Sequence, residues 1–200
     1  MIGYRGRHRL TDTNGRNKDM MKKVLIITGS PRANGNSNTL AKAFAKGAEE
    51  AGCHVAFFDA AKANIGACNA CNACYKNGKA CAFSEDFSAL ADMRATTDVL
   101  VFATPVYWFN CSAQLKCVID KFYSFCVAEK VPPIKETFLL ATCEDTDPAT
   151  FDVLTSNYEK VISYLKWSDG GRILVNSVGP VGTIESTDAL AEAEEMGKSL

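Results

Sequence analysis

Residues 24–40 read Val24-Leu-Ile-Ile-Thr-Gly-Ser-Pro-Arg-Ala-Asn-Gly-Asn-Ser-Asn-Thr-Leu40, and this stretch decides the fold. Its first residues form a continuous apolar run, which is typical of a parallel strand buried on both faces. A loop from Gly29 to Gly35 follows, and a helix begins near Asn36, with Asn36, Ser37 or Asn38 as the expected cap. Such a corner directs free backbone N–H groups and a positive helix end to one point. We therefore predict an anion site there, with phosphate as the usual occupant.

The composition of the loop narrows the choice of phosphate ligand. It lacks the lysine and the spacing of the ATP and GTP loop, and it lacks the dinucleotide fingerprint G-x-G-x-x-G. Hydroxyls and amides dominate instead, which suits a single terminal phosphate, as in FMN. The alternative is an ordinary strand–loop–helix connection without a ligand. The candidate phosphate-binding residues are Ser30, Arg32, Asn34, Asn36, Ser37, Asn38 and Thr39.

Length, charge and hydropathy bound the remaining possibilities. Two hundred residues fit one domain, and a net charge of −1 gives no bulk electrostatic case for nucleic acid. Every apolar run is too short to span a bilayer, and no apolar signal segment follows the basic start, so we expect a cytoplasmic protein. Residues 1–21 are predicted to be a disordered tail, and residues 22–200 form the domain.

Apolar runs and helical periodicity alternate along the domain. The expected strands are residues 24–28, 53–59, 98–103, 137–142 and 172–178. The expected helices begin near 36 and then cover 84–94, 112–128, 148–167 and 187–197, with a break at Gly170-Gly171. Ser84 is the expected N-cap of the second helix, with Glu85 and Asp86 in its first turn. This alternation predicts an α/β fold, a doubly wound five-stranded parallel sheet in three layers.

The loop after the third expected strand is aromatic, and it reads Thr104-Pro-Val-Tyr-Trp-Phe-Asn110. Pro105 stiffens it, and Tyr107, Trp108 and Phe109 can offer a flat apolar face to a tricyclic ring. Backbone N–H groups of the loop can meet polar atoms of such a ring without a titrating side chain. The alternative is that these aromatic residues serve core or interface packing.

Three motifs together resemble a known family. They are Gly29-Ser-Pro-Arg-Ala-Asn-Gly-Asn-Ser37, Thr104-Pro-Val-Tyr-Trp108, and Leu115-Lys with Ile119-Asp-Lys121. These are similar to the phosphate loop, the isoalloxazine loop and the following helix of the NADPH-dependent FMN reductase and iron–sulfur flavoprotein group, which has a flavodoxin-like fold. The similarity covers about residues 22–200.

The resemblance implies the sheet order 2-1-3-4-5, with FMN at the carboxyl ends of the first and third strands. It adds ring contacts from Pro105, Val106, Tyr107, Trp108, Phe109, Asn110 and Cys143 to the phosphate-binding residues. FMN itself would perform the chemistry, so no catalytic side chain is expected. NAD(P)H would be the reductant, and a quinone, a flavin, a metal or a protein the acceptor. A homodimer or homotetramer is implied, and the alternative function is a non-enzymatic electron carrier.

The chain holds nine cysteines, and four of them form the pattern C-x2-C-x2-C-x6-C in a long loop at residues 60–84. The ligand candidates are Cys68, Cys71, Cys74 and Cys81. Such spacing lets thiolates converge on one centre, as a [4Fe–4S] cluster requires, and it resembles the compact motif of iron–sulfur flavoproteins. Zinc could take the same sulfurs. Unoccupied packing or redox thiols, including those of a flavin-binding redox sensor, remain an alternative.

Overall fold

The computed structural model describes residues 21–200, so the predicted tail lies outside the described residues except for Met21. In chain order the elements are β1 (Lys23–Thr28), α1 (Asn36–Glu50), β2 (His54–Asp59), α2 (Glu85–Arg94), β3 (Val99–Tyr107), β4 (Asn110–Cys111), α3 (Ala113–Asp120), α4 (Tyr123–Val127), β5 (Glu136–Thr142), η2 (Pro148–Phe151), α5 (Asp152–Leu165), β6 (Ser168–Val175), η3 (Thr183–Ser186) and α6 (Ala189–Lys198).

The sheet has the order β2-β1-β3-β5-β6, and all four pairings along this path are parallel. This confirms the doubly wound fold and its strand order. The sheet has six strands and not five, because β3 runs on past Ala103 into the predicted aromatic loop. The chain then turns at Trp108 and Phe109, and the two-residue β4 pairs antiparallel with the end of β3.

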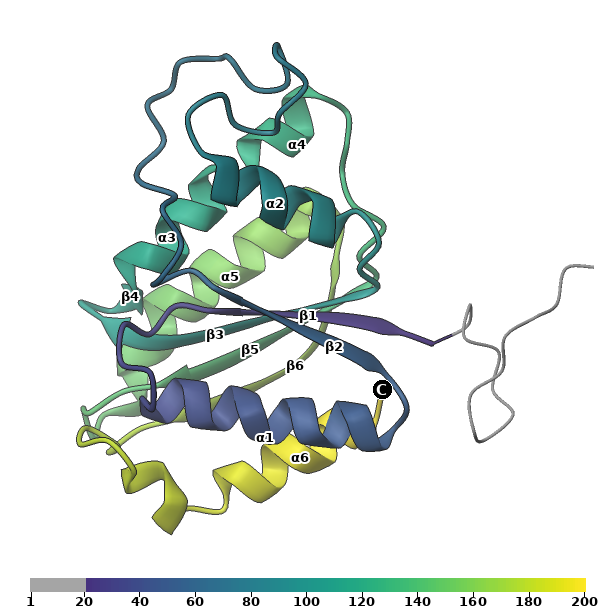
Figure 1. Cartoon of the computed structure of the whole chain (residues 1–200). Coiled ribbons are helices and arrows are strands. Elements are labelled where there is room, and N and C mark those ends of the chain that lie inside the picture. The colour runs from purple at the N-terminus through teal and green to yellow at the C-terminus, as the bar shows by residue number, and fades with distance from the viewer. Residues whose placement is uncertain (1–20) are drawn as a thin grey trace, which may run out of the picture.

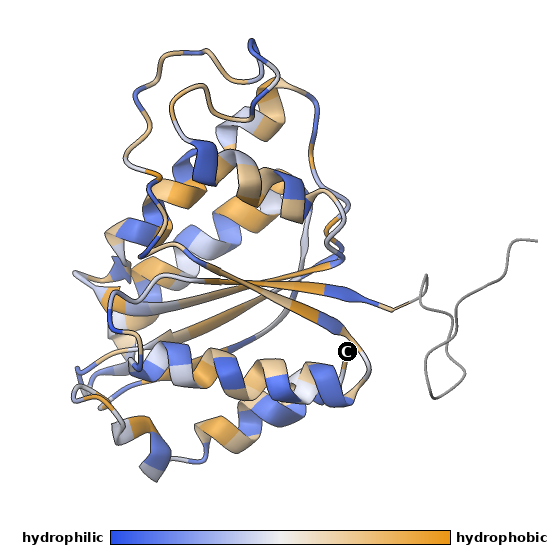
Figure 2. Ribbon diagram, viewed as in Figure 1, coloured by the Kyte–Doolittle hydropathy of each residue, from blue (hydrophilic) through white to orange (hydrophobic). Residues whose placement is uncertain are grey.

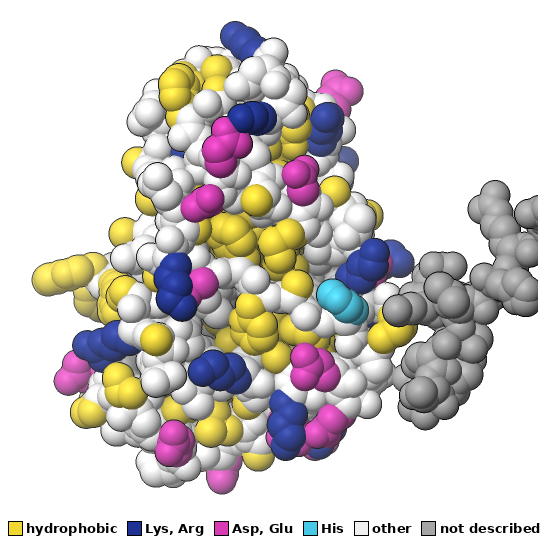
Figure 3. All heavy atoms as spheres, viewed as in Figure 1, with side chains coloured by type: hydrophobic (Ala, Val, Ile, Leu, Met, Phe, Trp, Pro, Cys, Tyr) yellow, Lys and Arg dark blue, Asp and Glu magenta, His cyan; other side chains and the backbone are white. Residues whose placement is uncertain are grey.

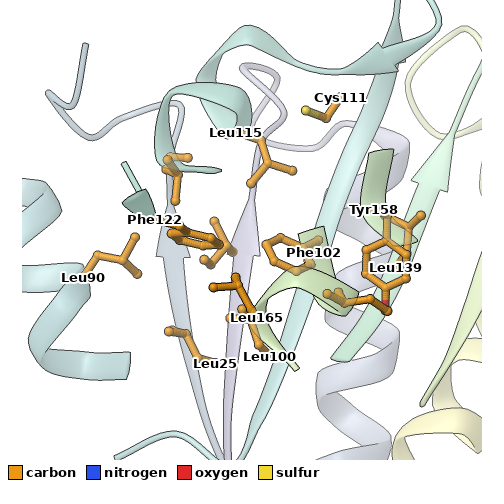
Figure 4. Packing of buried hydrophobic residues seen from close by; sticks show 14 of the residues in the cluster. Leu25, Leu90, Leu100, Phe102, Cys111, Leu115, Phe122, Leu139, Tyr158 and Leu165 are labelled. Carbon is orange, nitrogen blue, oxygen red and sulfur yellow. The ribbon is translucent and has the colours of Figure 1, made fainter. Parts of the chain in front are cut away.

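Helices cover both faces of the sheet, which gives three layers (Figure 1). One face packs α1 and α6, and the other packs α2 to α5. The central strands β1, β3 and β5 are largely hydrophobic, whereas the edge strand β6 begins with polar residues and the helices alternate between polar and apolar sides (Figure 2). Figure 4 shows the core on the α2–α5 side, where Phe102 of β3 lies between Phe122 and Tyr158. No helix in the described part of the chain is long and apolar enough to cross a membrane.

Local sequence signals place several elements correctly. The expected cap of α2 is confirmed, since Ser84 Oγ accepts a hydrogen bond from the Phe87 N–H at 3.2 Å. Glu85 and Asp86 occupy the first turn and Arg94 the last, so the charges at both ends of α2 interact favourably with the helix dipole.

Two boundaries differ from the sequence prediction. The helix expected at 112–128 is divided into α3 and α4, with Lys121 and Phe122 between them. Gly170 and Gly171 do not interrupt the chain but lie inside β6, at a shift in its register with β5. A Cβ atom at Gly170 would collide with the ring of Phe138, so the glycine permits close strand packing.

Candidate functional site: a phosphate corner beside an aromatic hairpin

The site lies where the order of the sheet reverses. β1 pairs with β2 on one side and with β3 on the other, so the chain leaves β1 and β3 at adjacent carboxyl ends. Ligands of doubly wound folds bind in the crevice that such a reversal creates. A hollow of about 160 Å³ lies at this reversal. It is lined by residues of the loop and first turn at 29–37, which we call the phosphate corner after its expected ligand, and by residues at the end of β3.

The helix that starts at this corner has no side-chain cap. α1 begins at Asn36, and its N-cap is Gly35, which offers no side-chain hydrogen bond. The prediction that Asn36, Ser37 or Asn38 would cap the helix is therefore wrong. An uncapped first turn leaves its N–H groups without a capping side chain, which is the arrangement that an anion can use.

Two buried side chains of the first turn also have atoms without partners. The Oγ of Ser37, a residue only 1% exposed, makes no hydrogen bond, and neither does Oδ1 of Asn38. Buried polar atoms in folded proteins are normally satisfied, so the unpartnered Ser37 Oγ beside the hollow offers a place for a ligand atom. Ser37 Oγ can donate to a phosphate oxygen. Asn38 is not among the residues that line the hollow, and its Nδ2 donates to the Arg32 carbonyl at 3.0 Å. This corner therefore fits the phosphate of FMN.

The sequence placed Asn36 among the candidate phosphate-binding residues, but its side-chain amide is hydrogen-bonded to another loop of the protein. Its Nδ2 lies 2.9 Å from the carbonyl oxygens of Val178 and Pro180 and 3.2 Å from Thr183 Oγ1. Its Oδ1 accepts the Gly182 N–H at 3.0 Å. The amide is thus fully engaged in holding residues 178–183, which we call the closing loop. Sequence reasoning missed this loop, because no local signal joins positions 140 residues apart.

The other polar residues of the corner mainly shape the loop itself. Ser30 is buried, lines the hollow and accepts a hydrogen bond from the Arg32 N–H at 3.2 Å. Arg32 also lines the hollow, and its Nη1 donates to the Gly179 carbonyl at 3.4 Å. Thr39 donates to the Gly35 carbonyl, and Asn34 is exposed and does not line the hollow.

The aromatic segment is a two-residue β-hairpin and not an open loop. Pro105, Val106 and Tyr107 line the hollow. Trp108 and Phe109 form the turn with φ of 48° and 64°, a left-handed conformation that is unfavourable for large side chains. Trp108 is 94% exposed. Figure 3 shows a hydrophobic projection at the edge of the molecule where Figure 1 places β4.

A buried bridge joins the two corners. Ser112 Oγ donates to the Gly29 carbonyl at 2.6 Å, and the Ser112 N–H donates to Thr104 Oγ1 at 3.0 Å. A Cβ atom at Gly29 would lie 2.6 Å from Ser112 Oγ, so only glycine allows this approach. The bridge fixes the phosphate corner relative to the hairpin. Sequence reasoning missed both Thr104 and Ser112 as parts of the site.

The far wall of the hollow comes from the loop after β5. Thr142, Cys143 and Glu144 line it, as the resemblance implied for Cys143. The Cys143 Sγ lies 3.5 Å from the Asp145 carbonyl, and burial raises the pKa of the thiol. Asn110 lies outside the hollow, where its Oδ1 accepts the Cys111 N–H. The hollow is smaller than the roughly 300–1,000 Å³ of a pocket that encloses its ligand, so a flavin ring would lie partly at the surface.

The four cysteines of the C-x2-C-x2-C-x6-C pattern line a second hollow beneath the 60–84 loop, and Lys121, Tyr123 and Ser124 complete it on the other side. Cys68 and Cys71 are exposed, and Cys74 and Cys81 are half-buried. Four thiols around one hollow fit a sulfur-ligated centre as a set of donors. Their positions do not, because within residues 21–200 no group of three or more His, Cys, Asp or Glu side chains is arranged to hold a metal ion.

Comparisons with known proteins agree with this picture. The chain is 32% identical over 99 residues to an iron-sulfur flavoprotein of Methanocaldococcus jannaschii, a match that covers 50% of this chain and 51% of that protein. It is 21% identical over 182 residues to a Bacillus subtilis protein named as an NAD(P)H-dependent FMN-containing oxidoreductase, covering 88% and 97%. The chain spans about half the length of the iron-sulfur flavoproteins that it matches.

The fold has solved counterparts. An NAD(P)H:quinone oxidoreductase from Methanothermobacter marburgensis superposes with a TM-score of 0.73 at 17% identity, covering 90% of this chain and 96% of that chain. A family model described as NADPH-dependent FMN reductase matches residues 22–136, which include the phosphate corner, the four cysteines and the aromatic hairpin. The chain therefore belongs to the NADPH-dependent FMN reductase family.

Proposed function

We propose that this protein is an FMN-dependent oxidoreductase that takes electrons from NADH or NADPH and passes them to a quinone, a flavin, a metal or a protein acceptor. The observation that carries the proposal is the buried, unpartnered Ser37 Oγ in the uncapped first turn of α1, at the reversal of the sheet. Family membership supports it, because the matching family model is described as an NADPH-dependent FMN reductase.

FMN, when bound, would supply the hydride-accepting and electron-transferring chemistry. The protein's part is binding and orientation. Ser30, Ser37 and the first turn of α1 would hold the phosphate, and the closing loop would cover that side of the site. Pro105 to Tyr107 would border the ring, at a position that the Ser112 bridge fixes relative to the phosphate corner.

Surface charge fits a small-molecule or protein acceptor. On the face shown in Figure 3, acidic and basic side chains are interspersed among hydrophobic ones, and no large patch of one sign is visible. A polyanion such as nucleic acid would call for a concentrated basic surface.

The test is direct. Purified protein should quench the fluorescence of added FMN at a stoichiometry of one per chain, and the complex should oxidise NADH or NADPH when a quinone is supplied. Binding of FMN without turnover of either nicotinamide would contradict the enzyme and favour an electron carrier. Failure to bind FMN would contradict both.

We further propose a sulfur-ligated centre, such as a [4Fe–4S] cluster, between Cys68, Cys71, Cys74 and Cys81. Two observations support it: the four thiols line one hollow, and several relatives that align over about half their length are named iron-sulfur flavoproteins. The 60–84 loop would have to move its sulfurs closer together. Anaerobic purification followed by iron and sulfide analysis tests this, and zinc analysis of the same sample tests the alternative metal. Protein that stays free of metal after reconstitution would contradict the sulfur-ligated centre and support the alternative of unoccupied thiols.

The implied homodimer or homotetramer also remains a proposal. Light scattering coupled to size-exclusion chromatography would give the mass in solution, and a mass of 21.6 kDa would contradict it.

A further inference from the structure

Lys121 is a buried ammonium group that lacks an acidic partner. It follows α3 directly and is 6% exposed. Its Nζ donates to the Ala67 carbonyl oxygen at 3.2 Å. None of the ion pairs found among the described residues includes Lys121, whereas Lys116, five residues earlier, pairs with Asp120 on the surface. A buried charge is costly unless it is paired, so this position calls for an anion.

The lysine also lies at the hollow of the four cysteines. The four cysteines and Lys121 line the same hollow, and Lys121 is the one charged side chain among its described lining residues. The carbonyl that Lys121 binds belongs to Ala67, which directly precedes Cys68. The same side chain therefore anchors the start of the cysteine loop and brings a positive charge to the place where the thiols gather.

A second contact holds the loop on the same helical surface. Tyr123 Oη donates to Asn72 Oδ1 at 3.2 Å, between Cys71 and Cys74. The loop is thus fixed to the α3–α4 side at two points, with Cys68 and Cys71 between them and Cys74 and Cys81 further along the chain.

We infer that Lys121 is the built-in counter-charge of an anionic, thiolate-ligated centre in this hollow. Four thiolates around one divalent metal ion carry a net charge of about −2, and four thiolates around a [4Fe–4S] core of charge +2 carry the same. One buried ammonium would offset half of that charge in a region that water screens poorly. The inference rests on the proposed sulfur-ligated centre, and it assigns a role to a residue that is itself no ligand.

The experiment is an anaerobic titration of the reduced, metal-free full chain with Co²⁺, followed by the thiolate-to-cobalt charge-transfer absorption. Four proteins are compared: the unaltered chain, Lys121→Met, Lys121→Arg and Lys116→Met. Methionine keeps the length and apolar stem of lysine but not its charge, arginine keeps the charge, and Lys116 is the exposed control on the same helix. We expect Lys121→Met to raise the dissociation constant for Co²⁺ about tenfold or more, as one unit charge nearby can do. The other two variants should stay within about threefold of the unaltered chain.

FMN affinity and thermal unfolding of the metal-free variants report on folding separately. If Lys121→Met binds Co²⁺ as tightly as the unaltered chain, the inference is wrong while the sulfur centre stands. If Lys121→Arg loses affinity as Lys121→Met does, the lysine acts by its shape and not by its charge, which also overturns the inference. If the unaltered chain binds no Co²⁺ and takes up no cluster, both the sulfur centre and the role of Lys121 fall. The proposed FMN site would be unaffected in each case.

Discussion

Replacing Asn36 with alanine should release the closing loop from the phosphate corner. The amide joins four groups of residues 178–183, three through Nδ2 and one through Oδ1. Because Nδ2 carries only two hydrogens, about three full hydrogen bonds are lost and not four. At about 1 kcal/mol for each, the free energy of unfolding should fall by about 3 kcal/mol.

For a domain of this size, a loss of about 3 kcal/mol corresponds to a fall in Tm of about 6–12 °C. The assay is thermal unfolding without FMN, followed by circular dichroism. Hydrogen exchange measured by mass spectrometry should show faster exchange at residues 178–183 in Asn36→Ala. FMN should also bind more weakly, by about tenfold, because the variant must order this loop on binding.

A matched control is available in Asn176→Ala. Asn176 also donates its Nδ2 to a backbone carbonyl, that of Thr146 at 2.7 Å, but it is only half-buried and its side chain makes this one hydrogen bond at the surface. We expect this variant to lose less than about 1 kcal/mol. Equal Tm values for Asn36→Ala and Asn176→Ala, together with unchanged exchange at residues 178–183, would refute the view that Asn36 holds the closing loop.

Three further predictions follow from particular side chains. Ser37→Ala removes an unpartnered hydroxyl, so Tm without FMN should stay level or rise slightly while the dissociation constant for FMN rises about tenfold; an unchanged FMN affinity would contradict this. Trp108→Gly should be about 1 kcal/mol more stable than Trp108→Ala, because glycine adopts the left-handed φ of 48° without steric strain and alanine does not. Equal denaturant midpoints for the two variants would show that the turn is unstrained. Burial raises the pKa of Cys111 from 9.0 to about 11, so the unfolded chain loses this proton first as the pH rises. The stability that Cys111 contributes should therefore be complete below pH 9 and fall by about 2–3 kcal/mol by pH 11. Denaturant unfolding across that range should show a decline that is smaller by about this amount in Cys111→Ala, and equal declines in the two proteins would contradict the prediction.

Local signals in the sequence were sufficient for most of the fold. The apolar run at residues 24–28 identified a strand buried on both faces, and Ser84 followed by two acidic residues identified the start of α2. These signals work because burial and capping depend mainly on residues within one turn or one strand. The aromatic hairpin was harder, since Trp108 and Phe109 are unusual in a turn that asparagine and glycine normally occupy.

The sequence by itself predicted the alternating strands and helices of the doubly wound sheet, the corner that we propose binds an anion, and the set of four cysteines, because each pattern is carried by residues close together in the chain. Tertiary structure alone decided what individual side chains do at these places. Asn36 is adjacent to the phosphate corner in sequence, yet its amide is taken up by a loop that lies more than 140 positions away. Lys121 likewise ends a motif that resembles the family, yet only the fold buries it at the hollow of the four cysteines, with its Nζ on the Ala67 carbonyl. Hydrogen bonds and buried charges are settled by distances across the folded chain, and one sequence without its fold does not contain those distances.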